Sequence, residues 1–312
     1  MKRFAITDYG EAATVFTTIE ALPRPVTSQH IRVSIQAFGI NPYDISLRQG
    51  AMKNVRELKF PYVLGNDGAG IVTEVAEDVT DFKVGDRVVL HAVGGTYGEE
   101  IVLPTKKASQ LPDAIDWAHA AGMVTVGITA YNLLYHALQI SKSATVMVQG
   151  ASGGVGSCLV QLLKQNGNKV LATASSKNKS YVESLGVDSF SAYDKEDSGK
   201  IFSDQADIVI DATKGSRGIT SGVKSMKNGG TYVALNDLPS KEQQVKEGKY
   251  LHFAPSKEYA DREALDFLIQ SYLKGNFRIH IATHLPFDLS GIIKGHELLE
   301  GHPPAGKIVL EK

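Results

Sequence analysis

The sequence predicts an α/β protein with a β-rich domain followed by a domain built around a parallel sheet. Over the first 110 residues, short β-branched runs alternate with glycine and proline, a pattern typical of a compact barrel-like domain. From Thr145 onward the pattern changes to strand, glycine turn, helix and strand. Because strands that alternate with helices build parallel sheets through right-handed crossovers, the second half predicts βαβ units.

Composition limits the possible functions. A length of 312 residues predicts two domains at about 150 residues each. The net charge of −1 provides no broad basic field, so we expect neither a nucleic-acid partner nor a membrane partner. The single cysteine excludes a disulfide framework and every multi-cysteine metal site. The chain starts without an apolar signal segment and has no run of about 18 apolar residues, so we expect a cytoplasmic location.

Local patterns predict the elements of the first half. Residues 31–36 alternate apolar and polar side chains, as expected for a half-buried strand. Residues 70–75 and 86–90 are β-branched runs bounded by glycine, aspartate or proline, and they predict two further strands. Apolar residues at helical spacing then predict helices at 116–121 and 127–138.

The second half predicts the parallel sheet and the helices that connect its strands. We expect strands at residues 145–149, 169–174, 206–211 and 231–235, and helices at 155–165 and 181–185. Toward the C-terminus we expect a helix at 261–273, a strand at 277–282, a helix at 290–299 and a strand at 307–310.

The glycine-rich turn at residues 150–156 lies between a predicted strand and a predicted helix, which is the context of a dinucleotide site. Gly150 can turn the chain sharply, and Gly153 or Gly154 can leave bare backbone for a pyrophosphate. Gly156 lets the helix pack closely on the sheet, and the phosphates would face free N–H groups at the helix N-terminus. A tight turn without a ligand would fit the same glycines, so both interpretations stay open.

The residues after the next strand bear on the choice of dinucleotide. An NAD site usually has an acidic residue about 20 positions after the glycines, to bind the ribose 2′-hydroxyl. Here Ser175, Ser176, Lys177 and Lys179 follow the strand, and no acid occurs before Glu183. Hydroxyls and lysines suit a 2′-phosphate, so the sequence favours NADPH over NADH. A solvated polar loop with chance lysines is the alternative.

Several short motifs occur together along the chain, at residues 39–44, 61–70, 84–88, 127–131, 149–156 and 306–309. In this order they resemble the medium-chain dehydrogenase/reductase superfamily. More narrowly, they resemble its zinc-free quinone oxidoreductase branch, the zeta-crystallin-like proteins. The resemblance covers nearly the whole chain, and the combination of motifs is specific although each one is short.

The resemblance implies a definite architecture. A GroES-like β-rich catalytic domain would be discontinuous, at residues 1–118 and 256–312. A Rossmann domain with a doubly wound parallel sheet would occupy residues 119–255, and the cofactor would bind in the cleft between the two domains. Relatives usually pair through their Rossmann sheets, so the resemblance also implies a homodimer or a homotetramer.

The chain lacks the zinc ligands of zinc-dependent relatives. Those relatives carry Gly-His-Glu where residues 65–67 here read Gly-Asn-Asp, and they have a ligating cysteine near position 40. The only cysteine, Cys158, lies in a predicted helix, where we expect a buried structural role. Without thiolate or imidazole ligands no tetrahedral zinc site can form, so we expect no metal. Reduction then requires an acceptor that spreads negative charge by itself, as quinones and α,β-unsaturated carbonyls do.

The resemblance also implies which residues form the site. The family asparagine that matches Asn41 points toward the nicotinamide, and Tyr43 offers a phenolic donor nearby. Several relatives have Tyr or Lys where Ser46 stands, which leaves the proton donor open. The expected cofactor-binding residues are Thr129, Gly150, Ser152, Gly153, Gly154, Val155, Gly156, Ser175, Ser176, Lys177, Tyr193, Leu235, Asn236 and Phe253.

These observations together predict an NADPH-dependent, zinc-free oxidoreductase that transfers hydride to a quinone or to an α,β-unsaturated carbonyl. Two alternatives stay open. One is a 2-alkenal or enone reductase without quinone activity. The other is a non-catalytic protein that binds NADPH for a structural or redox-sensing purpose.

Overall fold

The computed structural model describes residues 1–256, 258–301 and 305–312, which form two compact units. Unit 1 comprises Met1–Thr125, Ala260–Leu273 and Ile279–Lys312, and unit 2 comprises Val126–Tyr259 and Lys274–Arg278. No helix among the described residues is long and apolar enough to cross a membrane.

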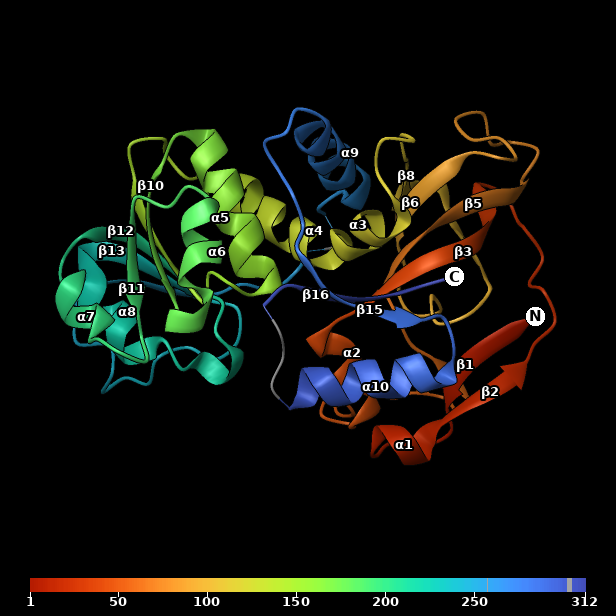
Figure 1. Cartoon of the computed structure of the whole chain (residues 1–312), viewed down its shortest axis with the longest axis horizontal. Coiled ribbons are helices and arrows are strands. Elements are labelled where there is room, and N and C mark those ends of the chain that lie inside the picture. The colour runs from red at the N-terminus through yellow and green to blue at the C-terminus, as the bar shows by residue number, and fades with distance from the viewer. Residues whose placement is uncertain (257, 302–304) are drawn as a thin grey trace. The chain divides into compact units, whose positions relative to one another are not determined.

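Two β-sheets form the framework of unit 1 (Figure 1). The larger sheet has seven strands in the order β15-β16-β3-β5-β6-β8, with β7 paired to β3, and the smaller sheet has the order β2-β1-β4. The strands are β1 (Lys2–Ile6), β2 (Phe16–Glu20), β3 (His30–Ile40), β4 (Tyr62–Val63), β5 (Asp67–Val75), β6 (Arg87–His91), β7 (Glu100–Pro104), β8 (Ala108–Gln110), β15 (Ile281–Pro286) and β16 (Lys307–Glu311).

The core of unit 1 lies around the long strand β3. Ile31, Val33 and Ile35 are fully buried, and the residues between them are half buried, so the strand predicted at 31–36 is confirmed. The helices and helical turns of this unit are α1 (Ala12–Val15), α2 (Pro42–Arg48), η1 (Thr105–Lys107), α3 (Trp117–Gly122), α9 (Asp261–Leu273) and α10 (Leu289–Glu300).

Unit 2 contains a six-stranded sheet in the order β11-β10-β9-β12-β13-β14, and all of its strand pairs are parallel. The strands are β9 (Thr145–Gln149), β10 (Lys169–Ala174), β11 (Ser189–Ala192), β12 (Ala206–Asp211), β13 (Met226–Ala234) and β14 (Gly248–His252). Strand order reverses at β9, as in a doubly wound sheet, so the predicted fold class is confirmed.

Helices flank both faces of this sheet, with α5 and α6 on one face and α7 and α8 on the other (Figure 1). The helices and helical turns are η2 (Leu133–Ala137), α5 (Gly154–Asn166), η3 (Ser176–Asn178), α6 (Lys179–Ser184), α7 (Ser198–Ile201), η4 (Lys214–Ser216) and α8 (Ile219–Ser225). Helix α4 (Val124–Asn132) begins at the last residues of unit 1 and continues in unit 2.

The predicted strand at residues 277–282 is wrong over its first four residues, because β15 begins only at Ile281. Phe277 and Ile279 are both buried, which explains the alternating pattern. Between them, the backbone of Arg278 bonds to a side chain instead of a neighbouring strand. Its N–H donates to Gln161 Oε1 at 2.8 Å, and its carbonyl accepts from Gln161 Nε2 at 2.9 Å.

Candidate functional site

The glycine turn of unit 2 adopts a conformation that requires glycine at two positions. Gly150 follows β9 with a φ of 74°, in the left-handed region that glycine favours. A Cβ on Gly156 would lie 2.2 Å from the carbonyl oxygen of Gly150, so the first turn of α5 packs directly on bare backbone. Gly153 is the N-cap of α5, and the 13-residue helix begins at Gly154.

This turn fits a pyrophosphate. The first N–H groups of an α-helix have no partner inside the helix, and the helix dipole favours negative charge there. Gly154, Val155 and Gly156 form the first turn of α5, and Ser152 immediately precedes its N-cap. A strand, a sharp glycine turn and a helix N-terminus therefore combine as a dinucleotide requires.

The other cofactor candidates lie at the same edge of the sheet. Ser175, Tyr193, Leu235 and Phe253 directly follow the carboxyl ends of β10, β11, β13 and β14, and Asn236 follows Leu235. Ligands of open parallel sheets bind at this edge, near the strand where the order reverses. Thr129 is separate from this group, since it lies half buried in α4.

Hydrogen bonds link the loop after β10 to the glycine turn. Asn178 Nδ2 donates to Ser152 Oγ at 3.0 Å and to Ser175 Oγ at 3.1 Å. Lys177 is exposed in the short helical turn η3. The hydrogen bonds of Asn178 thus hold this loop, which carries Ser175, Ser176 and Lys177, against Ser152.

One residue of this region is absent from the sequence-based prediction. Asp194, two residues after β11, accepts from Ser176 N at 2.6 Å and from Ser176 Oγ at 2.7 Å. Hydrogen bonds from Ser176 lower the pKa of Asp194, so this exposed carboxylate is charged at neutral pH. Recognition of strand β11 in the sequence would have pointed to Asp194. The pairing of β11 with β10 brings together the loops that follow the two strands.

In unit 1, Asn41 belongs to a buried polar network. Its Nδ2 donates to Asp67 Oδ2 at 2.8 Å, and Lys307 Nζ donates to its Oδ1. Lys307 Nζ lies 3.3 Å from Asp67 Oδ2 and donates to the carbonyl of Ile40 at 3.1 Å. Asn41, Asp67 and Lys307 are 3%, 0% and 4% exposed, so this ion pair is fully enclosed by protein.

A second buried carboxylate, Asp44, adjoins this network. Its two oxygens accept from Asn41 N at 2.9 Å and from Gly65 N at 3.2 Å. Burial raises the pKa of Asp44 to about 7 against these hydrogen bonds, and the nearby charge of Asp67 adds to the shift. Desolvation therefore outweighs both hydrogen bonds at this carboxylate.

Three further buried polar side chains near Asp44 are linked by hydrogen bonds. Arg48 Nε donates to His296 Nδ1 at 3.3 Å, and His296 Nε2 lies 3.2 Å from Tyr97 Oη. Burial, helped by the charge of Arg48, lowers the pKa of His296 to about 3, so the ring is neutral. Burial and the adjacent Asp44 raise the pKa of Tyr97 well above its ordinary value.

Tyr43 lies in a separate, half-buried cluster with Arg56 and Tyr62. Arg56 Nη1 donates to Tyr43 Oη at 3.1 Å, and Arg56 Nη2 donates to Tyr62 Oη. Tyr62 Oη donates to the carbonyl of Val93 at 3.4 Å, which uses its hydrogen. An arginine can only donate, so the hydrogen of Tyr43 is directed elsewhere. Ser46, by contrast, donates back to the carbonyl of Pro42 at 3.1 Å.

The residues around Asn41 do not fit a zinc ion. No group of three or more His, Cys, Asp or Glu side chains that could hold a metal occurs within the described ranges. Cys158 is buried in α5, in the other unit, as expected for a structural residue.

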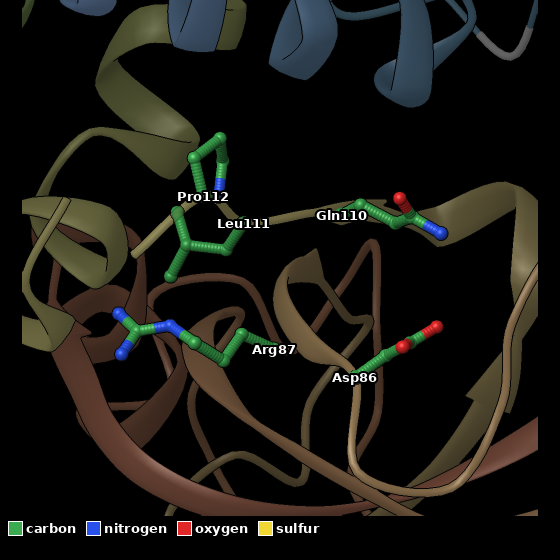
Figure 2. Close-up of a pocket in the computed structure, with 5 residues that line it drawn as sticks. All are labelled: Asp86, Arg87, Gln110, Leu111 and Pro112. Carbon is green, nitrogen blue, oxygen red and sulfur yellow. The ribbon is translucent and has the colours of Figure 1, made fainter. Parts of the chain in front are cut away.

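The residues that line a small surface pocket in unit 1 make contacts that support the fold. Figure 2 shows its lining, which is Asp86, Arg87, Gln110, Leu111 and Pro112. Arg87 lies over the ring of Trp117 at 3.8 Å from its centroid and donates to the carbonyl of Ile115 at 2.6 Å. Asp86 accepts from Lys83 N at 3.0 Å. None of the predicted site residues lines this pocket.

Comparisons with known proteins agree with the fold. The alcohol dehydrogenase GroES-like domain family matches residues 27–113, and the zinc-binding dehydrogenase family matches residues 154–254. A probable quinone oxidoreductase of Schizosaccharomyces pombe is 30% identical over 96% of this chain and 94% of its own length. A chloroplastic NADPH-dependent alkenal/one oxidoreductase of Arabidopsis thaliana is 32% identical over 75% of this chain and 62% of its own.

Solved structures share the same fold over the whole chain. The quinone oxidoreductase of Escherichia coli, determined in complex with NADPH, superimposes with a TM-score of 0.87. The match covers 100% of both chains at 24% sequence identity.

Proposed function

We propose that this chain uses NADPH to reduce quinones. The chain belongs to the quinone oxidoreductase branch of the medium-chain dehydrogenase/reductase superfamily and is an oxidoreductase. Reduction of α,β-unsaturated carbonyls is the second candidate, favoured by the name of the Arabidopsis relative. The observation that carries the proposal is the meeting of separate cofactor candidates at one edge of the unit 2 sheet, beside the N-terminus of α5.

Unit 2 would hold the cofactor. The N–H groups at the start of α5 would bind the pyrophosphate, and Gly150 and Gly156 would keep the backbone accessible. Ser175, Ser176 and Lys177 would bind the 2′-phosphate. Tyr193, Leu235, Asn236 and Phe253, at the other strand ends, and Thr129 on α4 would line the rest of the cofactor.

NADPH, when bound, supplies a hydride to the acceptor, whose oxygen then gains negative charge and must receive a proton. Asn41 is the candidate hydrogen-bond donor to that oxygen, because Asp67 binds only one of the two hydrogens on Nδ2. The network with Lys307 and Asp67 would fix the orientation of this amide. The products are oxidised cofactor and a hydroquinone, or a saturated carbonyl compound, with one proton consumed.

Tyr43 is the candidate proton donor. Arg56 Nη1 donates to a lone pair of the phenol oxygen, which positions the phenol and leaves its hydrogen for another acceptor. Tyr43 thus offers the phenol that Ser46 cannot. This assignment gives Arg56 the role of a positioning residue.

The Tyr43→Phe variant tests the proton donor. We expect kcat to fall about 100-fold, the scale of general acid catalysis, while NADPH affinity stays unchanged. Tyr62→Phe is the matched control, since Tyr62 also bonds to Arg56 but spends its hydrogen on Val93. Equal losses in the two variants would show that the Arg56 cluster only supports the fold.

Steady-state rates with a panel of quinones and a panel of enones and enals test the acceptor. Higher kcat/KM values across the quinones support the proposal. Activity confined to the enones and enals makes the chain an alkenal/enone reductase. Tight NADPH binding without turnover in either panel would instead favour a non-catalytic, cofactor-binding protein.

Assembly as a homodimer or homotetramer through the sheets of unit 2 is part of the proposal. Strand β14 stands at one end of the strand order, where another chain could extend the sheet. Light scattering of the purified chain gives the oligomeric state directly, and a monomer at all concentrations would refute this part.

A further inference from the structure

Asp194 bonds to Ser176, one of the residues proposed to bind the 2′-phosphate of the cofactor ribose. Ala174 and Ala192 pair at the ends of the parallel strands β10 and β11, and Tyr193 N donates to the carbonyl of Ala174 at 3.2 Å. The loops that follow these strands are therefore side by side. This brings Asp194 onto Ser176, a candidate ligand of the 2′-phosphate.

The carboxylate uses both donors that Ser176 offers. Oδ1 accepts from Ser176 N at 2.6 Å, and Oδ2 accepts from Ser176 Oγ at 2.7 Å. A phosphate at this position would need the same donors and would meet a like charge. A ribose 2′-hydroxyl could instead donate a hydrogen bond to the carboxylate, as it does to the acidic residue of NAD sites.

We propose that Asp194 is a specificity-determining residue whose carboxylate opposes the 2′-phosphate of NADPH, so that this chain also accepts NADH. The acid that the sequence lacks after β10 is supplied by the loop after β11. Lys177 attracts the 2′-phosphate and Asp194 repels it, so the balance of these two charges sets the preference. This inference rests on the proposed cofactor site of unit 2.

The Asp194→Asn variant tests the inference through binding alone. Asparagine keeps an oxygen that can accept from Ser176, but it removes the charge and adds a donor for phosphate. The Kd values of NADPH and NADH are measured by fluorescence titration in the absence of any acceptor. We expect the ratio of the NADH Kd to the NADPH Kd to rise about tenfold, the size of one modest charge interaction.

Asp204→Asn is the matched control. Asp204 is an exposed aspartate of the same unit, held by Lys246 Nζ at 2.7 Å, and its loss changes the net charge equally. The ratio should stay unchanged in this variant. A ratio that changes equally in both variants, or in neither, overturns the assignment of Asp194. Failure of the wild-type chain and the Asp194→Asn variant to bind either nucleotide overturns the cofactor proposal as well.

Discussion

The two candidate sites each contain an aspartate that accepts two hydrogen bonds, yet the pKa values of the two carboxylates are shifted in opposite directions. Asp44 in unit 1 is 1% exposed, and burial raises its pKa to about 7. Asp194 in unit 2 is exposed, and its bonds to Ser176 lower its pKa. Similar hydrogen bonding therefore gives opposite results, because desolvation outweighs it in one place and is nearly absent in the other.

This difference separates the roles of the two regions. The ion pair of Asp67 and Lys307 is buried, so its charges act on the stability of unit 1 and on the orientation of Asn41. The loop around Ser176 is open, so its charges act on an incoming ligand. Changes in the first region should appear mainly in unfolding, and changes in the second mainly in binding.

The largest expected effect comes from breaking the buried ion pair. Lys307→Met leaves Asp67 charged and buried, so we expect a loss of about 3–5 kcal/mol in the free energy of unfolding, measured with urea. Lys227→Met is the control, because the Lys227–Asp207 pair is similarly close, at 2.7 Å, but its side chains are 44% and 38% exposed. That variant should lose about 1 kcal/mol or less. Equal losses would contradict the comparison of closed and open regions.

A second prediction uses pH. Asp44 has a raised pKa in the folded state, so its contribution to stability decreases as pH rises from about 4 to about 7. His296 has a lowered pKa, so its contribution decreases as pH falls from about 6.5 to about 3. Over the shared range the two slopes oppose each other, and each approaches about 1.4 kcal/mol per pH unit.

Removal of one group should expose the slope of the other. We expect Asp44→Asn to become less stable toward acid and His296→Gln to become more stable toward acid between about pH 4 and 6.5. Urea unfolding across this range measures both slopes, which do not depend on the baseline stability of each variant. Parallel profiles for the two variants and the wild type would contradict the assigned protonation states.

The smallest expected effect concerns the open loop. Lys177→Glu reverses an exposed charge beside the proposed 2′-phosphate site, so we expect NADPH to bind about tenfold more weakly while NADH changes little. The exposed Lys200→Glu variant, which carries the same charge change at α7, controls for net charge. Equal weakening of both nucleotides by Lys177→Glu would refute the assignment of this lysine to the 2′-phosphate.

Local patterns predicted much of the fold, including the strand, glycine turn and helix of the candidate site in unit 2. The glycine turn was accessible because a strand, its glycines and a helix follow one another in the sequence, and β9 and α5 lie where predicted. The buried network was not accessible, since Asn41, Asp67 and Lys307 meet only through the pairing of distant strands. Asp194 was missed for a related reason, because β11 is short and lacks a recognisable pattern.

Strand β14 was also missed, since its five residues are mostly exposed and include a lysine and a histidine. Its partner β13 ends in a run of buried apolar residues that a sequence pattern can detect, whereas β14 depends on its pairing with β13. The Tyr43 cluster depends in the same way on Arg56, from a loop without a recognised motif.

A single-turnover experiment tests whether the chain transfers hydride from NADPH to a quinone without a metal. The purified chain, treated with a metal chelator and loaded with NADPH, is mixed anaerobically with one equivalent of a quinone. The absorbance of the reduced nicotinamide is then followed. We expect one NADPH to be oxidised for each quinone that becomes hydroquinone, at a rate that the chelator does not change. Retention of bound NADPH with no transfer to any quinone or enone, or transfer that requires added zinc, would contradict it.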